Sequence, residues 1–221
     1  MRLFDLTHPV RTGMPVYPGD PEVALRPALT AARDGVNLLH VAMGSQSGTH
    51  VDAPYHVDDR WPRLDELPLE RFLGPGVVVD ARGLAPRTPI GREYFVRYGE
   101  RLRKGVLVLV VTGWSEHWGS ERYQAHPYLS RASAEYLVER GVQTVGVDAM
   151  SVDATPAREL TAHRVLCGAG AVIAENLRGL DALCELPAEA DLEIALLPLR
   201  LAGPRADGAP IRAIARVREA R

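Results

Sequence analysis

The sequence predicts an α/β fold, a single domain with a mixed β-sheet flanked by helices. Short apolar runs bounded by turn residues alternate with segments of helical pattern through the middle of the chain. Both ends of the chain are rich in strand-forming residues. A length of 221 residues suits one domain, and no segment has the composition of a linker. We therefore expect one domain over residues 1–221.

The first third of the chain is expected to be mostly strand and loop. Glycine and proline are frequent up to residue 23, and both disturb regular hydrogen bonding, so they indicate an ordered loop. In chain order we predict a strand at 2–7, this loop at 8–23, a strand at 37–43, and a loop with a short helix at 61–74.

The middle and end of the chain alternate between strand and helix. The run VLVLVVTG is typical of a strand buried on both faces, and SRASAEYLVERG is typical of an amphipathic helix with a glycine stop. We predict strands at 76–81, 106–113 and 142–149, and helical segments at 88–102, 130–141 and 171–184. Two closing strands, 191–203 and 209–219, would be joined by a turn at 204–208.

Composition excludes several classes of protein. The net charge is −2 and the isoelectric point is about 6.4, so no electrostatic partner such as nucleic acid or a membrane surface is indicated. Cys167 and Cys184 are too few for a disulfide framework and lack the spacing of a zinc site. No apolar run of about 20 residues occurs, and the N-terminus lacks the apolar core of a signal peptide. We expect a cytoplasmic protein.

One stretch, SQSGTHVDAPYHV at residues 45–57, concentrates side chains that can carry chemistry. Side chains of an extended segment alternate between two faces, so the even-numbered Gln46, His50, Asp52 and His56 can point the same way. Imidazole and carboxylate together suit a divalent ion such as Zn²⁺, Mn²⁺ or Fe²⁺. The alternative is a set of turn residues that hydrogen-bond locally. No serine or cysteine has the context of a catalytic nucleophile.

The same stretch resembles the HxGTHxDxPxH signature of the metal-dependent cyclase family, which includes bacterial kynurenine formamidases and isatin hydrolases. Further segments are similar to the opening, middle, second-ligand and final blocks of that family: DLTHPVRTGMPVYPGDP, HPYLSRASAEYLVERGVQTVGVDAMSVD, AHRVLCGAGAVIAENLRGL and DGAPIRAIA. The resemblance covers nearly the whole chain and implies the cyclase/kynurenine formamidase-like fold.

The resemblance implies a role for six residues. The matching metal ligands are His50, Asp52, His163 and Glu175, and His56 falls at the place of the catalytic acid/base histidine. His163 and Glu175 lie 12 positions apart, so they can share an ion only if the chain turns at Gly168 and Gly170. Tyr17 matches an aromatic pocket residue. Trp114 follows a buried strand, where it could line the pocket or pack in a loop.

Gln46 departs from the family, which usually has a histidine four residues before the GTH histidine. An amide oxygen is a weaker zinc donor than imidazole, so Gln46 would be a weak fifth ligand or a donor to the substrate carbonyl. One divalent ion balances the charges of Asp52 and Glu175, whereas two would leave an excess of +2. We therefore predict one ion, Zn²⁺ or Mn²⁺.

Other polar residues receive structural predictions. We expect Asp148 to be structural and Asp153 to support a ligand by hydrogen bonding. Asp207 and Arg212 would fix a turn. Four histidines match no ligand position and would pack or lie at the surface, namely His8, His40, His117 and His126.

The resemblance implies a metal-dependent hydrolase that cleaves an amide-type C–N bond, of the arylformamidase or cyclic-amide kind, in a small-molecule substrate. Two alternatives stay open on the sequence. One is a lactonase or cyclase/dehydratase of secondary metabolism that uses the same ion. The other is a non-catalytic small-molecule binding protein, because Gln46 replaces the usual histidine. The resemblance also implies a homo-oligomer, a dimer or larger.

Overall fold

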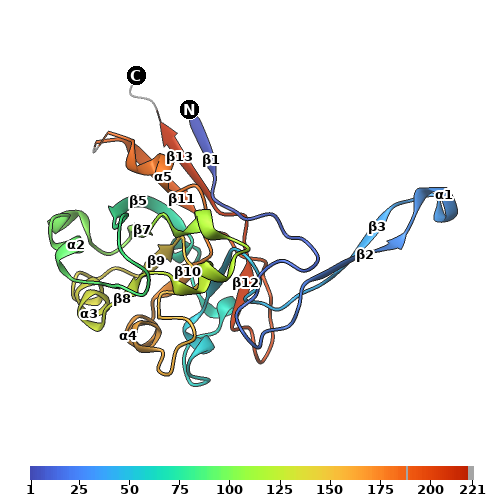
Figure 1. Ribbon diagram of the computed structural model, residues 1–221, viewed down its shortest axis with the longest axis horizontal. Coiled ribbons are helices and arrows are strands. Elements are labelled where there is room, and N and C mark those ends of the chain that lie inside the picture. The colour runs from blue at the N-terminus through green and yellow to red at the C-terminus, as the bar shows by residue number, and fades with distance from the viewer. Residues whose placement is uncertain (188, 219–221) are drawn as a thin grey trace.

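The computed structural model describes residues 1–187 and 189–218. Within them, nine strands form one sheet in the order β1-β13-β11-β5-β7-β9-β10-β4-β12 (Figure 1). The strands are β1 (Arg2–Asp5), β4 (His50–Asp52), β5 (Leu73–Asp80), β7 (Leu107–Val111), β9 (Thr144–Val147), β10 (Val172–Glu175), β11 (Asp191–Ala195), β12 (Gly208–Pro210) and β13 (Ile214–Arg218). The four central strands β5, β7, β9 and β10 run parallel, and the outer ones pair antiparallel. The sheet is therefore mixed, as predicted.

Two hydrophobic cores lie on the two faces of this sheet. Val108 and Val110 of β7 belong to one core, and Leu107, Leu109 and Val111 belong to the other. This alternation is what a strand buried on both faces requires, and it explains the unbroken apolar run in the sequence.

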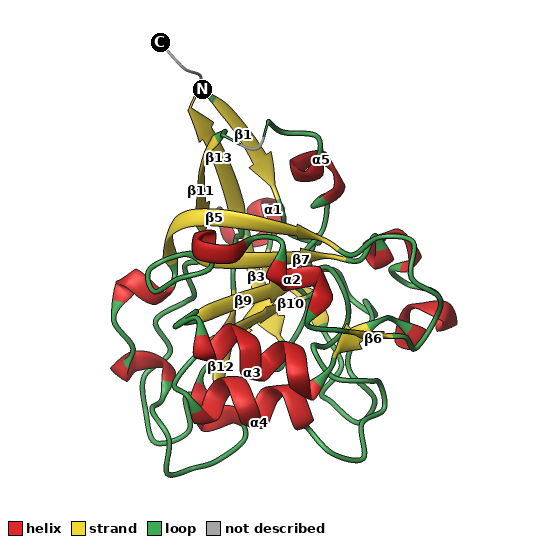
Figure 2. Cartoon of the chain, turned by 90° about the vertical axis from the view of Figure 1, so that its left-hand side faces the viewer, coloured by secondary structure: helices red, strands yellow, loops and turns green. Residues whose placement is uncertain are grey.

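Helices α3 (Arg131–Glu139) and α4 (Thr161–Gly168) cover one face of the sheet side by side (Figure 2). Ser130 caps α3, since its hydroxyl accepts a hydrogen bond from the Ser133 amide at 3.1 Å. The other helices are one turn long: α1 (Ala31–Asp34), α2 (Glu93–Val96) and α5 (Asp181–Cys184). Residues 1–187 and 189–218 also contain six short 3-10 helices: 54–56, 64–66, 69–71, 99–101, 114–117 and 121–125.

The predicted helix at 171–184 is wrong. Its first part is strand β10, inserted between β9 and β4, and only α5 at its end is helical. The sequence AVIAENL mixes the helix formers Ala, Glu and Leu with the strand formers Val and Ile, and pairing in the sheet decides for a strand. The helix of this region lies earlier, in α4, and Gly170 turns the chain with a φ of 74°.

The prediction that a short turn joins the two closing strands is also wrong. β11 pairs with β13 as expected, but a long loop and the separate strand β12 lie between them. β12 pairs with β4 at the opposite end of the sheet. The last predicted strand residue, 219, lies outside the described part.

The helical segment predicted at 88–102 is reduced to α2 and one 3-10 turn, preceded by strand β6 (Pro89–Ile90), which pairs with β8 (Tyr128–Leu129).

One hairpin projects far from the body of the molecule (Figure 1). It consists of β2 (Ala24–Leu29) and β3 (Leu38–Ala42), with α1 at its tip. The strand predicted at 37–43 is thus confirmed as β3, whereas β2, which contains Pro27, has no counterpart in the sequence prediction. We call β2, α1 and β3 together the arm.

Gly208 allows β12 to approach β4 closely. A Cβ atom at this position would overlap the Val51 carbonyl oxygen and lie 2.9 Å from Gln46 Nε2. We expect Gly208→Ala to lower the free energy of unfolding by about 1–3 kcal/mol, as overpacking does. Urea denaturation measures this change. At Gly44 a Cβ would meet its nearest atoms at an ordinary 3.5 Å, so Gly44→Ala should stay within about 0.5 kcal/mol. Equal effects of the two substitutions would contradict the prediction.

Candidate metal centre

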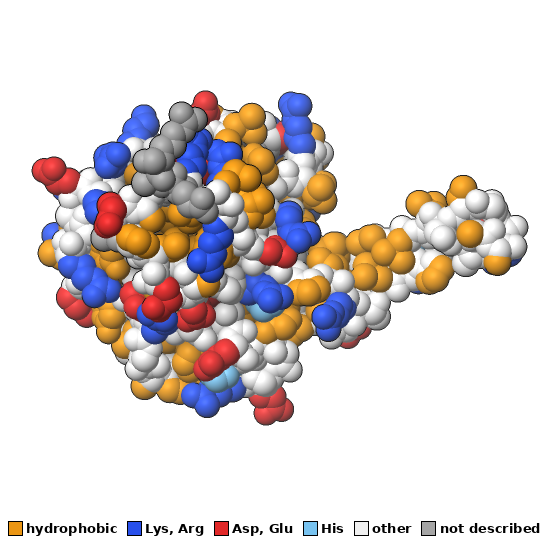
Figure 3. Space-filling view, turned by 90° about the horizontal axis from the view of Figure 1, so that it is seen from above, with side chains coloured by type: hydrophobic (Ala, Val, Ile, Leu, Met, Phe, Trp, Pro, Cys, Tyr) orange, Lys and Arg blue, Asp and Glu red, His pale blue; other side chains and the backbone are white. Residues whose placement is uncertain are grey.

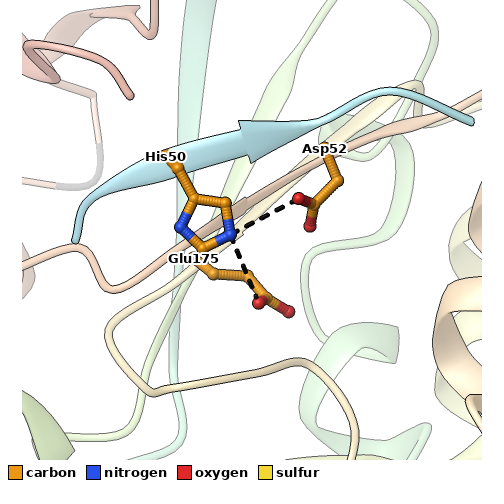
Figure 4. A group of neighbouring side chains, drawn as sticks. All are labelled: His50, Asp52 and Glu175. Carbon is orange, nitrogen blue, oxygen red and sulfur yellow. Dashed lines mark ion pairs between the residues drawn. The ribbon is translucent and has the colours of Figure 1, made fainter. Parts of the chain in front are cut away.

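Strands β4 and β10 bring three ligand-type side chains to one face of the sheet. His50 and Glu175 are direct partners in the antiparallel register, and Asp52 follows His50 by two residues. Figure 4 shows the three side chains converging. One ligand atom from each lies within 4.8 Å of the others. His50 Nε2 is 3.4 Å from Asp52 Oδ1 and 3.7 Å from Glu175 Oε2.

His163 reaches the same point from helix α4. Its Nε2 atom lies 3.6 Å from Asp52 Oδ2 and 3.5 Å from Glu175 Oε1. The turn between α4 and β10, predicted at Gly168 and Gly170, places a helix residue and a strand residue against each other. The structure therefore brings together the four predicted ligands, all of them buried.

Both histidines are oriented through their second ring nitrogen. His50 Nδ1 lies 2.7 Å from the Gly48 carbonyl oxygen, which can only accept a hydrogen bond. His163 Nδ1 lies 2.8 Å from an oxygen of Asp153, and that carboxylate also accepts from the backbone amides of residues 162 and 163. With the proton on Nδ1, each Nε2 lone pair points to the cluster, which is the tautomer that a metal ligand needs. The supporting contact predicted for Asp153 is thus present.

The cluster holds two carboxylates in close contact with the two imidazoles, and the pull of these carboxylates on positive charge is the test of whether a cation fits. Both carboxylate oxygens of Asp52 are buried without a hydrogen-bond partner among the described residues. Burial lowers the pKa of His50, but Asp52 and Glu175 outweigh this effect and raise the pKa to about 9. Burial and the charge of Asp52 raise the pKa of Glu175. Two imidazoles and two carboxylates around unsatisfied oxygens fit a divalent ion such as Zn²⁺ or Mn²⁺.

His56 lies beside this cluster, in the 3-10 turn at 54–56, where it contacts two further side chains. Gln46 Nε2 is 3.2 Å from His56 Nδ1 and 3.0 Å from Asp207 Oδ2, and that oxygen is 3.7 Å from His56 Nδ1. The role predicted for Asp207, fixing a turn, is therefore incomplete, because its carboxylate belongs to the site. No sequence signal pointed to this contact, since 161 positions separate Gln46 from Asp207.

A cavity of about 710 Å³ opens over these residues. His50, His163 and Glu175 line it together with His56 and Gln46. Tyr17 also lines the cavity, as predicted, and its hydroxyl accepts a hydrogen bond from the Ala157 amide at 3.1 Å. Sequence reasoning missed Asp20, which also lines the cavity and follows Tyr17 in the glycine- and proline-rich loop.

Trp114 does not line this cavity, so the pocket-wall reading of this residue is wrong. The side chain is buried in the hydrophobic core, and its Nε1 donates to the Arg122 carbonyl oxygen at 3.2 Å. Its ring packs edge-on against His117 with centroids 4.8 Å apart. The short turn after β7 folds the indole inward, which the sequence pattern could not show.

The remaining histidines pack or lie at the surface, as predicted. His8 is buried and stacks on Trp118 with ring centroids 4.0 Å apart, whereas His40 is exposed on the arm. His126 is buried between the Pro127 carbonyl oxygen and the Thr155 hydroxyl, each at 2.8 Å. Burial lowers the pKa of His126 to about 4.

This pKa predicts a stability that depends on pH. His126 stays neutral in the folded chain but titrates near 6.5 in the unfolded chain, so the unfolded state binds more protons between pH 6.5 and about 4. Above pH 6.5 His126 is neutral in both states, so it does not affect the free energy of unfolding. As the pH drops from 6.5 to about 4, protonation of the unfolded state lowers this free energy. Urea denaturation across this range should therefore show a shallower pH dependence for His126→Gln than for the natural chain. Identical slopes would contradict this assignment.

Comparison with known proteins agrees with the geometry. The family described as "Putative cyclase" matches residues 4–154, about two thirds of the chain. The chain belongs to the Cyclase family. It is 33% identical to the kynurenine formamidase of Bordetella petrii, over 97% of this chain and 98% of that protein. It is 35% identical to the kynurenine formamidase of Salinibacter ruber, over 98% of each.

Among solved structures, isatin hydrolase A from Labrenzia aggregata superposes with a TM-score of 0.84 at 26% identity, covering 97% of this chain and 93% of that one. These comparisons confirm the predicted Cyclase family, the fold class and the class of enzyme, a metal-dependent amide hydrolase. His163 and Glu175 lie beyond the residues matched to the family, so their place in the site follows from the fold. None of the helices in the described residues is long and apolar enough to cross a bilayer.

Proposed function

We propose that the chain hydrolyses the amide bond of a small aryl formamide or cyclic amide with one divalent ion, Zn²⁺ or Mn²⁺. The ligands would be His50, Asp52, His163 and Glu175. The observation that carries this proposal is the fully buried carboxylate of Asp52, whose oxygens have no hydrogen-bond partner among the described residues and which converges with the three other proposed ligand groups beneath a cavity. When bound, such an ion polarises a carbonyl group and lowers the pKa of a water molecule.

His56 is the proposed acid that protonates the leaving nitrogen. It lies at the edge of the cavity, and its ring centroid is 5.7 Å from that of His163. Burial lowers the pKa of His56, but Asp207 and Asp52 outweigh this effect and raise it, which favours the protonated, donating form. Tyr17 supplies an aromatic wall suited to a planar substrate.

Gln46 supports the proposal of a single ion. The usual family histidine at this place is absent, and the amide nitrogen of Gln46 already contacts His56 and Asp207. Elemental analysis after loading with excess Zn²⁺ is expected to find about one equivalent per chain. A ratio near two would contradict the mononuclear site.

A substrate panel tests the reaction. N-formylkynurenine and isatin, each assayed with Zn²⁺ and with Mn²⁺, represent the aryl formamide and the cyclic amide. Hydrolysis of either one by the metal-loaded protein, lost with a chelator, is the expected result. Inertness toward both amides combined with turnover of a lactone would show that the substrate class is wrong.

We also propose that the chain forms a homodimer through the arm. One face of the arm is apolar, because Leu25 is paired with Val41 and Pro27 with Leu39, and these side chains lie on the same side. Leu39 and Val41 are 54% and 50% exposed, and hydrophobic side chains gather along the arm in Figure 3. A two-stranded hairpin with so much exposed apolar surface is only marginally stable in water unless another surface packs against it.

We propose that a second copy of the chain packs against the apolar face of the arm. The body of the molecule carries a further exposed apolar group in the loop between β11 and β12, namely Leu197, Leu199 and Leu201. A two-fold arrangement lets each arm reach such a surface on the other copy. The arm also leaves the body between Asp20 and Gln46, which both line the cavity, so its packing would hold the cavity wall.

Light scattering coupled to gel filtration tests the dimer. The natural chain is expected to have twice the mass of one chain, and Leu39→Asp with Val41→Asp should give a monomer. The matched control replaces Arg26 and His40, paired on the other face of the arm, by serine and should stay dimeric. A monomeric natural chain, or a dimer that survives the two aspartates, would refute the proposal.

A further inference from the structure

Asn176 directly follows the proposed ligand Glu175 at the end of strand β10, and it lines the same cavity. Its backbone has a φ of 55°, in the left-handed region that asparagine adopts more readily than most residues with a side chain. Its amide donates to the Ala149 carbonyl oxygen at 2.9 Å, and its carbonyl oxygen accepts from the Thr49 hydroxyl at 2.6 Å. The backbone is therefore fixed at this point, next to the proposed metal centre.

One end of the Asn176 side chain is held in the core. The Tyr123 hydroxyl lies 2.8 Å from Asn176 Oδ1, and only 1% of Tyr123 is exposed. A phenol is protonated at neutral pH, and this hydroxyl makes no other hydrogen bond among the described residues, so its hydrogen has to point at Asn176. The atom of the Asn176 amide that faces Tyr123 is therefore the oxygen, and this contact sets the orientation of the whole amide.

The other end of the amide is available to a ligand. Nδ2 makes no hydrogen bond among the described residues, yet it keeps contact with solvent, unlike buried unpartnered atoms such as Ser47 Oγ. Because Asn176 is 6% exposed and lines the cavity, the accessible surface of Nδ2 opens into that cavity. A primary amide nitrogen carries two hydrogens and accepts none, so the fold presents an N–H donor to whatever occupies the cavity.

Gln46 is the donor that the sequence suggested for the substrate carbonyl, but its amide nitrogen is already engaged. Nε2 of Gln46 lies 3.0 Å from Asp207 Oδ2 and 3.2 Å from His56 Nδ1. Of the two side-chain amides that line the cavity in the described residues, Asn176 is the one whose nitrogen has no protein partner. The role of donor to a carbonyl oxygen therefore falls to Asn176.

We infer that Asn176 is a catalytic residue that donates an N–H hydrogen bond to the carbonyl oxygen of the amide substrate while that oxygen gains negative charge. The inference rests on the proposed function. In the step, hydroxide, formed when water loses a proton to the solvent, bonds to the carbonyl carbon, and the C=O electron pair moves to the oxygen that faces Nδ2–H. The pair returns as the C–N bond breaks, and the nitrogen takes a proton from His56. The acid formed loses its proton, which restores His56.

The fixed orientation of the amide gives this donor its effect. Tyr123 and the two backbone hydrogen bonds hold Asn176 in place before a substrate binds, so no reorganisation is needed during the reaction. A hydrogen bond to an oxyanion is stronger than one to a neutral carbonyl oxygen. The contact therefore stabilises the transition state more than the bound substrate, and its loss should lower kcat while KM changes little.

Nitrogen NMR tests the contact without turnover. The chain has two asparagines, Asn37 and Asn176, so ¹⁵N-labelled asparagine gives two side-chain amide groups. Phenylacetone, in which CH₂ replaces the amide nitrogen, offers a carbonyl that cannot be hydrolysed. In the Zn²⁺-loaded protein it should move an Nδ2 proton of Asn176 downfield. Asn37 is the internal control, because its Oδ1 accepts from the Ala31 amide on the arm, away from the cavity. An unmoved Asn176 signal at a phenylacetone concentration that blocks hydrolysis would contradict the contact.

Kinetics of two variants separate donation from a structural role. Asn176→Gly tolerates the left-handed backbone and removes the amide, whereas Asn176→Asp keeps an oxygen for Tyr123 and removes only the donor. Each should lower kcat by about 100-fold or more, with KM within about threefold and one equivalent of zinc retained. An Asn176→Asp protein with the natural kcat would overturn the inference, because the Tyr123 contact alone would then matter. A raised KM at unchanged kcat would overturn it as well.

Failure of the proposed function looks different in the same assays. A natural chain that hydrolyses neither the aryl formamide nor the cyclic amide would refute the proposed function, and the inference with it. A natural chain that hydrolyses one of them, combined with natural kcat in both Asn176 variants, would refute the inference alone.

Discussion

Asp52→Asn is expected to remove stoichiometric metal binding and, with it, hydrolysis. Asp52 is fully buried, its two oxygens have no hydrogen-bond partner among the described residues, and both proposed histidine ligands point at it. Loss of a partner that merely orients a ligand costs 10- to 100-fold in metal affinity, so loss of a direct carboxylate ligand should cost more than about 100-fold.

Elemental analysis after dialysis against a defined Zn²⁺ concentration measures this loss, with amide hydrolysis assayed on the same samples. Asp80→Asn is the matched control, because Asp80 pairs with Arg82 at the surface and lies outside the site. It should keep one equivalent of zinc and its activity. An Asp52→Asn protein that retains one equivalent of zinc would show that the ion is held elsewhere.

His56→Ala is expected to lower kcat by about 10²- to 10⁴-fold while the metal content stays unchanged. The imidazole lies beside the proposed ligands without being one of them, and its Nδ1 atom faces Gln46 and Asp207. Removing it takes away proton donation to the leaving nitrogen but leaves all four ligand groups in place.

Steady-state kinetics with a good amide substrate, together with elemental analysis, measures the effect. His117→Ala is the control, since His117 packs against Trp114 away from the cavity. Activity close to that of the natural chain in His56→Ala would remove His56 from the chemistry. Loss of metal in the same variant would instead make His56 a ligand, so the two assays together distinguish an acid from a ligand.

Much of the central sheet could be predicted from the sequence because its signals are local. The apolar runs that became β5, β7 and β9 need only burial on both faces, and the serine cap and glycine stop of α3 act within a few residues. Errors arose where pairing partners decide the structure. β10 combines the strand formers Val172 and Ile173 with the helix formers Ala174 and Glu175, and β12 becomes a strand only because β4 lies beside it.

The residues of the site also differ in whether the sequence could predict their place in it. His50 and Asp52 share a face through the two-residue period of a strand, which the sequence alone shows. His163 and Glu175 needed the resemblance to known proteins before the structure was seen. Asp207 carried no signal, since its contact with Gln46 depends on how β12 closes the edge of the sheet.

From the sequence by itself, residue type and local spacing determined that His50 and Asp52 can share one face of a strand. The enzyme class and the ligands His163 and Glu175 were implied only by the resemblance of the sequence to a known family. The tertiary structure alone decided that Trp114 packs in the core, that the arm projects, and that Gln46 stands between His56 and Asp207. Such contacts join segments far apart in the chain, and their geometry is set by strand order and register. Residue spacing along one strand does not contain that information.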